Sequence, residues 1–161
     1  MRVLVGGVGF RFLRDESVGP YMADRLASHT RDGVEVEVEV EDLGYHALGF
    51  AQNLQAREPY DRVVLVAAVR RGREPGTLDC YRWDGELPPP AEIQGYVGEA
   101  AVGMISLDGH LIVPGALGGL PDDVRVVEVE PGEEGWGEGF SPTIEALLDE
   151  IEEAVWTSTL P

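Results

Sequence analysis

Two continuous runs of branched apolar residues constrain the fold of this chain more than any other feature. Arg62–Ala68 is apolar at every position after its first residue, and Arg2–Gly6 opens the chain in the same way. Such runs are typical of central strands in a parallel sheet, because helices cover both faces of that sheet. Val34–Val40 instead alternates valine with glutamate, which predicts a strand with one wet face at a sheet edge.

Three segments between and after these runs have the features of helices. Apolar residues recur at helical spacing over 17–28, where Ser17 is the expected N-cap, and a second helix is expected over 47–56. Ser141-Pro142 begins a final helix, with serine at the N-cap and proline at the first helical position.

The remaining segments are less regular. Thr77–Trp83 and Val124–Glu130 are expected to be strands. The segment 86–98 contains three consecutive prolines and is expected to be irregular. The segment 100–117 stays ambiguous, because it is apolar but holds glycines and a proline that disfavour a helix interior.

Strands that alternate with helices predict an α/β fold with three layers, a mostly parallel twisted sheet of about five strands between helices. The chain has 161 residues, near the size of one domain, and shows no internal repeat or linker. We therefore expect a single domain over residues 1–161.

The charge of the chain is strongly acidic and uneven. It contains no lysine, and its 12 arginines face 30 acids, for a net charge of −18. Residues 1–82 carry a net −2 and residues 83–161 a net −16. This charge disfavours nucleic-acid binding, and the absence of lysine excludes a lysine-containing phosphate loop. We interpret the acidity as solubility; a basic partner surface is the alternative.

Cys80 is the one cysteine, so no internal disulfide can form, and its strand-like surroundings predict a buried core thiol rather than a nucleophile.

The apolar run at the N-terminus is too short for the core of a signal peptide. No stretch approaches 18 apolar residues, so we expect no membrane span and a cytoplasmic protein.

The loops that follow the first two strands hold the candidate site residues. Gly7 and Gly9 supply two glycines of a dinucleotide fingerprint, but Phe12 occupies the third position, so a tight turn is the better interpretation. Asp15 and Glu16 precede a helix at the carboxyl end of the first strand, where open α/β sheets place their sites. They either complement the helix dipole or bind a metal.

Asp42 and His46 follow the second strand. If that strand lies beside the first, their side chains are placed to approach Glu16 and form a carboxylate–histidine metal site. A solvated loop pair is the commoner outcome. The sequence contains no G-x-S-x-G, H-E-x-x-H or C-x-x-C motif.

The chain resembles the hydrogenase maturation endopeptidases through short motifs that occur in the same order along nearly its whole length. These motifs are Val3-Leu4-Val5-Gly6-Gly7-Val8-Gly9, Asp15-Glu16-Ser17-Val18-Gly19, Asp42-Leu43-Gly44, Glu74-Pro75-Gly76-Thr77, Val129-Glu130-Pro131 and Gly137-Glu138-Gly139-Phe140-Ser141-Pro142. The resemblance implies a phosphorylase/hydrolase-like α/β fold. It also implies a role in removing the C-terminal extension of a nickel–iron hydrogenase large subunit after nickel insertion.

Members of that family sense nickel with a glutamate, an aspartate and a histidine. The resemblance places the glutamate at Glu16, the aspartate position at Ala67 and the histidine position at Val102. Alanine and valine cannot donate a lone pair to a metal, so two of the three ligand positions are degenerate. One carboxylate holds a transition metal poorly, because affinity comes from several fixed ligands. We therefore expect weak nickel binding at best, and weak or no catalysis.

Three functions remain open from the sequence. The first is an active nickel-sensing endopeptidase, in which Asp42 and His46, with Asp15, would rebuild the metal site. The favoured alternative is a non-catalytic maturation chaperone or interaction module that binds a hydrogenase subunit. The third is a repurposed fold that binds an unrelated small ligand.

Overall fold

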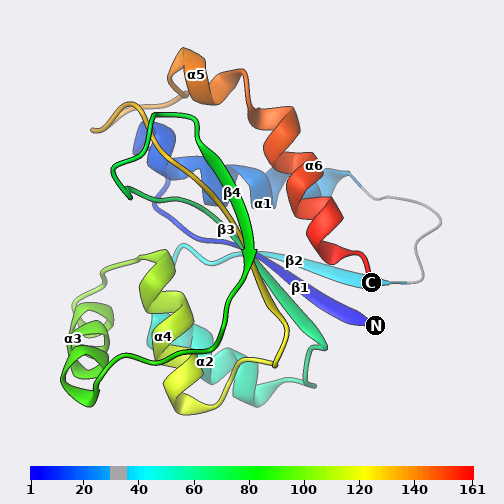
Figure 1. The fold of residues 1–161 in the computed structure, drawn as a ribbon, viewed down its shortest axis with the longest axis vertical. Helices are drawn as coiled ribbons and strands as arrows, with labels where there is room; N and C mark the ends of the chain where they lie inside the picture. The colour runs from blue at the N-terminus through cyan, green and yellow to red at the C-terminus, as the bar shows by residue number, and fades with distance from the viewer. Residues whose placement is uncertain (30–35) are drawn as a thin grey trace.

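The computed structural model describes residues 1–29 and 36–161 and shows a five-stranded sheet between helices (Figure 1). The strands are β1 (Arg2–Gly7), β2 (Glu37–Asp42), β3 (Arg62–Ala68), β4 (Leu78–Arg82) and β5 (Val124–Val129). Their order is β2-β1-β3-β5-β4, and only the β4–β5 pair is antiparallel. The predicted mostly parallel α/β fold is confirmed.

Helices cover both faces of this sheet. They are η1 (Arg14–Ser17), α1 (Val18–Ser28), α2 (Ala47–Ala56), α3 (Pro90–Ala101), α4 (Leu107–Leu117), α5 (Pro142–Glu145) and α6 (Leu148–Thr159). Figure 1 shows α1 and α6 on one face and α2 and α4 on the other. None of the helices in the described part of the chain is both long and apolar enough to cross a membrane.

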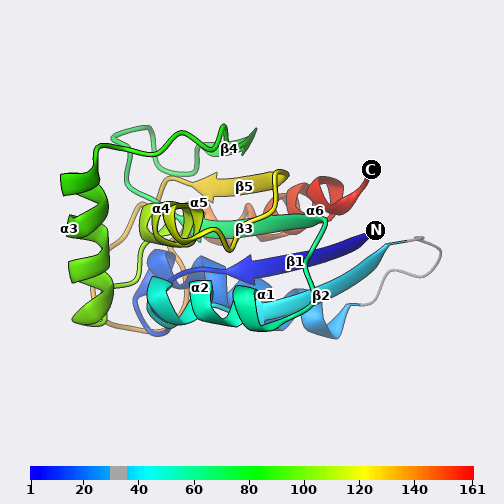
Figure 2. The same ribbon diagram turned by 90° about the horizontal axis from the view of Figure 1, so that it is seen from below.

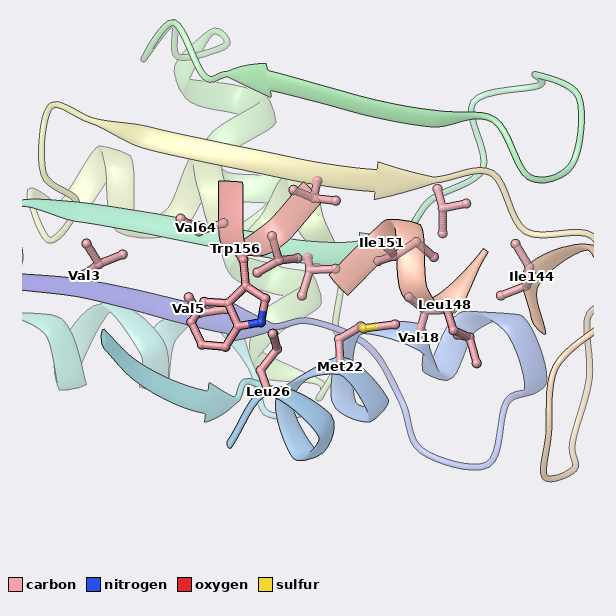
Figure 3. Close-up of a cluster of buried hydrophobic side chains, with 14 residues drawn as sticks. Val3, Val5, Val18, Met22, Leu26, Val64, Ile144, Leu148, Ile151 and Trp156 are labelled. Atoms are coloured by element: carbon pink, nitrogen blue, oxygen red, sulfur yellow. The ribbon is translucent and has the colours of Figure 1, made fainter. Parts of the chain in front are cut away.

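The continuous apolar strands supply two cores at once, because successive side chains of a strand point to opposite faces. On one face Val64 packs with Met22 of α1 and Ile151 of α6 (Figure 3). On the other face Leu65 belongs to a cluster with Phe50 of α2. The central positions predicted for β1 and β3 are thus confirmed.

The alternating strand lies at one edge of the sheet, as its pattern predicts. Val38 and Val40 of β2 pack against the α1–α6 core, while Glu37, Glu39 and Glu41 alternate with them and point to the other side of the strand. Val34 and Glu35, which the predicted strand includes, lie outside the described residues.

Three local predictions are wrong. The segment 86–98 is not irregular throughout, since α3 begins at Pro90, and proline is compatible with a first helical position. The final helix divides into α5 and α6 around Ala146. Cys80 is exposed rather than buried, because it lies on the edge strand β4. In the ambiguous segment, α4 begins after the capping side chain of Ser106.

Candidate functional site

A cleft of about 270 Å³ opens at the carboxyl ends of β1 and β3. Figure 2 shows the arrowheads of β1 and β5 pointing toward the end of the molecule where α3 lies. The cleft is lined by the loop after β1, by η1, by the end of β3 and its following loop, and by the start of α4. This is the position where open α/β sheets bind their ligands.

Close backbone packing fixes the loop that forms one wall of the cleft. A Cβ atom on Gly7 would lie 2.1 Å from the carbonyl oxygen of Gly19 in α1. A Cβ atom on Gly9 would lie 2.5 Å from the carbonyl oxygen of Glu16. Only glycine permits these approaches. The two glycines therefore serve the tight turn that the sequence indicates, because they let β1 approach α1 and the following loop approach η1.

Glu16 lies half-buried in η1 and lines the cleft. Its backbone N–H donates to the carbonyl of Leu13 at 3.0 Å. Within residues 1–29 and 36–161, its carboxylate makes no hydrogen bond or ion pair. The cleft thus contains one carboxylate that is available to a ligand.

Ala67 lines the same cleft at the end of β3, with only 2% of its surface exposed. Glu16 and Ala67 therefore line one cleft. The Ala67 methyl group offers only hydrocarbon to the cleft.

Val102 lies outside the cleft, which corrects its predicted position. Its side chain is 80% exposed, at the end of α3, and its N–H is bonded within that helix terminus. The residues of this segment that reach the cleft are Ile105 to Asp108. The wall of the cleft therefore begins a few residues after Val102, because Val102 lies at the solvent-exposed end of α3.

Asp15 is fully buried and is not a cleft residue. One of its oxygens accepts from the backbone N–H groups of Gly132 and Glu133, both at 2.8 Å, and from the hydroxyl of Ser141. The other accepts from the Ser141 N–H at 2.7 Å. Burial alone would raise the pKa of Asp15, but these hydrogen bonds outweigh it and lower the pKa. Asp15 therefore fastens the loop between β5 and α5.

Asp42 and His46 also have other partners. One Asp42 oxygen pairs with the guanidinium of Arg11 at 2.6 Å, and the other accepts from the Gly44 N–H at 2.8 Å. His46 caps α2 by accepting from the Gly49 N–H at its Nδ1. Neither residue lines the Glu16 cleft.

The donor set in this cleft does not fit nickel. Transition-metal sites use several fixed donors, usually with nitrogen or sulfur among them. Among the described residues, no three His, Cys, Asp or Glu side chains are grouped so that they could hold a metal ion. In the cleft itself, Ala67 supplies hydrocarbon and no donor, and Asp108 is engaged by the guanidinium of Arg71.

An ionic network that the sequence analysis did not identify fixes the far wall of the cleft. The guanidinium of Arg71 donates to both carboxylate oxygens of Asp108, at 2.8 and 2.9 Å, and also forms an ion pair with Glu128 at 3.2 Å. Glu128 is 3% exposed and also binds Arg73 and the hydroxyl of Tyr81. Burial, together with the Glu128 carboxylate, raises the pKa of Tyr81 to about 12. The network ties the start of α4 to the end of β5.

Arg70 is the cation at the cleft. Its side chain is 44% exposed, and its Nε forms an ion pair with Glu134 of the β5–α5 loop. The cleft therefore has one cation that already has a partner, apolar walls, and the carboxylate of Glu16.

The fold and the position of this cleft define an α/β protein with its site at the carboxyl ends of a parallel sheet. Solved structures with the same architecture include hydrogenase maturation endopeptidases, which this chain resembles over nearly its whole length. No protein-family model and no curated protein sequence matches the chain.

Three of these solved structures show the extent of the similarity. HybD of E. coli is 21% identical, with 98% of this chain and 91% of that chain covered and a TM-score of 0.67. A hydrogenase 2 maturation peptidase from a Thaumarchaeota archaeon is 22% identical, with 98% and 97% covered and a TM-score of 0.64. An endopeptidase from Escherichia coli is 25% identical, with 98% and 91% covered and a TM-score of 0.69.

Proposed function

We propose that this chain is a cytoplasmic, non-cleaving relative of the hydrogenase maturation endopeptidases, and that it binds the large subunit of a nickel–iron hydrogenase. The observation that carries the proposal is the composition of the cleft. The cleft lies at the carboxyl ends of β1 and β3 and contains the carboxylate of Glu16, and Ala67 beside it offers hydrocarbon and no further donor.

Such a cleft favours binding over metal-dependent chemistry. Its volume of about 270 Å³ is just below the range of roughly 300–1,000 Å³ that is usual for small-molecule sites. Apolar walls with a few polar groups are typical of sites that hold a ligand in one orientation. We propose that the walls at Leu13 and Ile105 contact apolar side chains of a polypeptide segment, while Glu16 accepts hydrogen bonds from it.

Complex formation with a nickel-loaded large-subunit precursor tests this role. We expect a one-to-one complex in size-exclusion chromatography with light scattering, and binding measurable by calorimetry. Ile105→Arg places a charge in the cleft and should weaken the complex at least about tenfold, the equivalent of 1.4 kcal/mol.

Val102→Arg is the matched control, because it introduces the same charge on a neighbouring but exposed position outside the cleft. It should leave the affinity within about twofold, the usual range for surface substitutions. Equal effects of the two variants, or no complex with the natural protein, would contradict the proposed role of the cleft.

A further inference from the structure

Other residues of the loop that follows β1 border a second pocket. Its volume is about 280 Å³, and it shares no lining residue with the Glu16 cleft. Its walls come from the 11–12 loop, from η1, from α1, from the β5–α5 loop and from α5. It combines three aromatic rings with carboxylates that come from three different elements.

The aromatic wall is held in a fixed arrangement. Tyr21 of α1 and Phe140 meet edge to face, with ring centroids 5.0 Å apart and planes at 79°. Phe12 completes the wall with a ring that is 56% exposed, on a backbone with φ of 64°. A bulky residue at such a φ is strained by about 1–3 kcal/mol and persists only where neighbouring structure holds it. Here the N–H of Gly137 donates to the Phe12 carbonyl at 2.8 Å.

The charges of the pocket are unbalanced. Arg11 is its one lining cation, and its guanidinium is committed to Asp24, at 2.7 and 2.9 Å, and to Asp42. Glu138 and Glu145 also line the pocket. In the part of the chain that the structure describes, their carboxylates have no hydrogen-bond or ion-pair partner. Two uncompensated negative charges therefore face an aromatic surface.

We infer that this pocket binds a basic side chain of a partner polypeptide, and that arginine fits it best. A cation is attracted both to aromatic faces and to carboxylates. Arginine is favoured over lysine because its flat guanidinium stacks on rings while its fork of N–H groups engages a carboxylate. The net charge of −18 strengthens the approach of a basic segment and repels an acidic one. This inference is independent of the proposed role of the Glu16 cleft.

A peptide series tests the inference directly. Three peptides share an uncharged glycine- and serine-containing frame and carry arginine, lysine or citrulline at the centre. Binding is followed at low salt by chemical-shift changes in ¹H–¹⁵N spectra of the labelled full chain. We expect the arginine peptide to bind most tightly and the citrulline peptide at least about tenfold more weakly. The shifts should be centred on Gly139 and Phe140.

Two double variants distinguish binding in this pocket from attraction by the overall negative charge of the protein. Glu138→Gln with Glu145→Gln should weaken arginine-peptide binding about tenfold. The matched control, Glu58→Gln with Glu92→Gln, makes the same charge change at positions that do not line the pocket, and it should change binding less than about twofold.

Phe12→Gly separates loss of the ring from loss of the fold. Glycine adopts the positive φ without strain, so thermal stability should be kept or increased while peptide binding falls. Equal binding of the arginine and citrulline peptides, equal effects of the two double variants, or the absence of binding would each overturn the inference.

Discussion

Replacement of Asp15 provides a quantitative test of how the loops around both pockets are held. Its carboxylate is fully buried and accepts four hydrogen bonds at 2.7–2.8 Å, all from residues 132, 133 and 141. Hydrogen bonds to charged groups contribute roughly 1.5–3 kcal/mol each when measured singly, but they do not add when they share one acceptor group. We expect Asp15→Ala to lower the free energy of unfolding by about 4 kcal/mol, because it leaves buried N–H donors without an acceptor.

Asp15→Asn should cost less, about 2 kcal/mol, since its amide oxygen can replace the carboxylate oxygen that accepts three bonds. Its NH₂ group must then face the Ser141 N–H, where a donor meets a donor. Urea unfolding followed by circular dichroism measures both losses. Glu133→Gln is the control in the same loop, because its exposed side chain should change stability by less than about 0.5 kcal/mol.

The pH dependence follows from the lowered pKa of Asp15. Because its pKa in the folded chain lies below the ordinary value of 3.8, its contribution is fully present above about pH 4. It is lost as the pH falls through the lowered pKa. The difference in stability between the natural chain and Asp15→Asn should therefore shrink below pH 4. A difference under 0.5 kcal/mol at pH 7, or one that grows in acid, would refute this reasoning.

Three further predictions concern stability and the cleft. Burial lowers the pKa of His110, so the natural chain should lose urea resistance as the pH falls from 8 through about 6.5 toward 5, and His110→Leu should lose less over that range. Arg71→Met should lower the free energy of unfolding by about 2 kcal/mol in thermal melts, because it removes one partner of a buried carboxylate. Ala67→Asp with Ile105→His should create nickel binding detectable by calorimetry, since both positions line the cleft, whereas Ala67→Asp with Val102→His should not.

Much of the sheet could be predicted because its signals are local. The apolar runs of β1 and β3 identify central strands by themselves, and the helix expected over 47–56 matches the observed bounds of α2. The edge position of β4, and with it the exposure of Cys80, could not be predicted, because strand pairing depends on the tertiary path of the chain. Helix α3 gave no apolar periodicity, since Ala100 is its only buried residue.

The candidate site was predictable only in part. Motif order along the chain brings Glu16 and Ala67 together, and the structure places both in one cleft. The motif containing Val102 falls on an exposed turn, where sequence offers no packing signal. The partners of Asp15 are 117 to 126 residues away, so its four hydrogen bonds have no local signature. The contact of Arg71 with a carboxylate 57 residues away is equally hidden.

The mass of a nickel-loaded large-subunit precursor, followed over hours with this protein present, tests the central claim most directly. An active hydrogenase maturation endopeptidase acting on the same precursor serves as the positive control. We predict that the positive control shortens the precursor by its C-terminal extension, while this chain leaves the mass unchanged, because Glu16 lacks companion donors in the cleft. Loss of the extension at a rate comparable to the control, abolished by Glu16→Gln, would contradict the account.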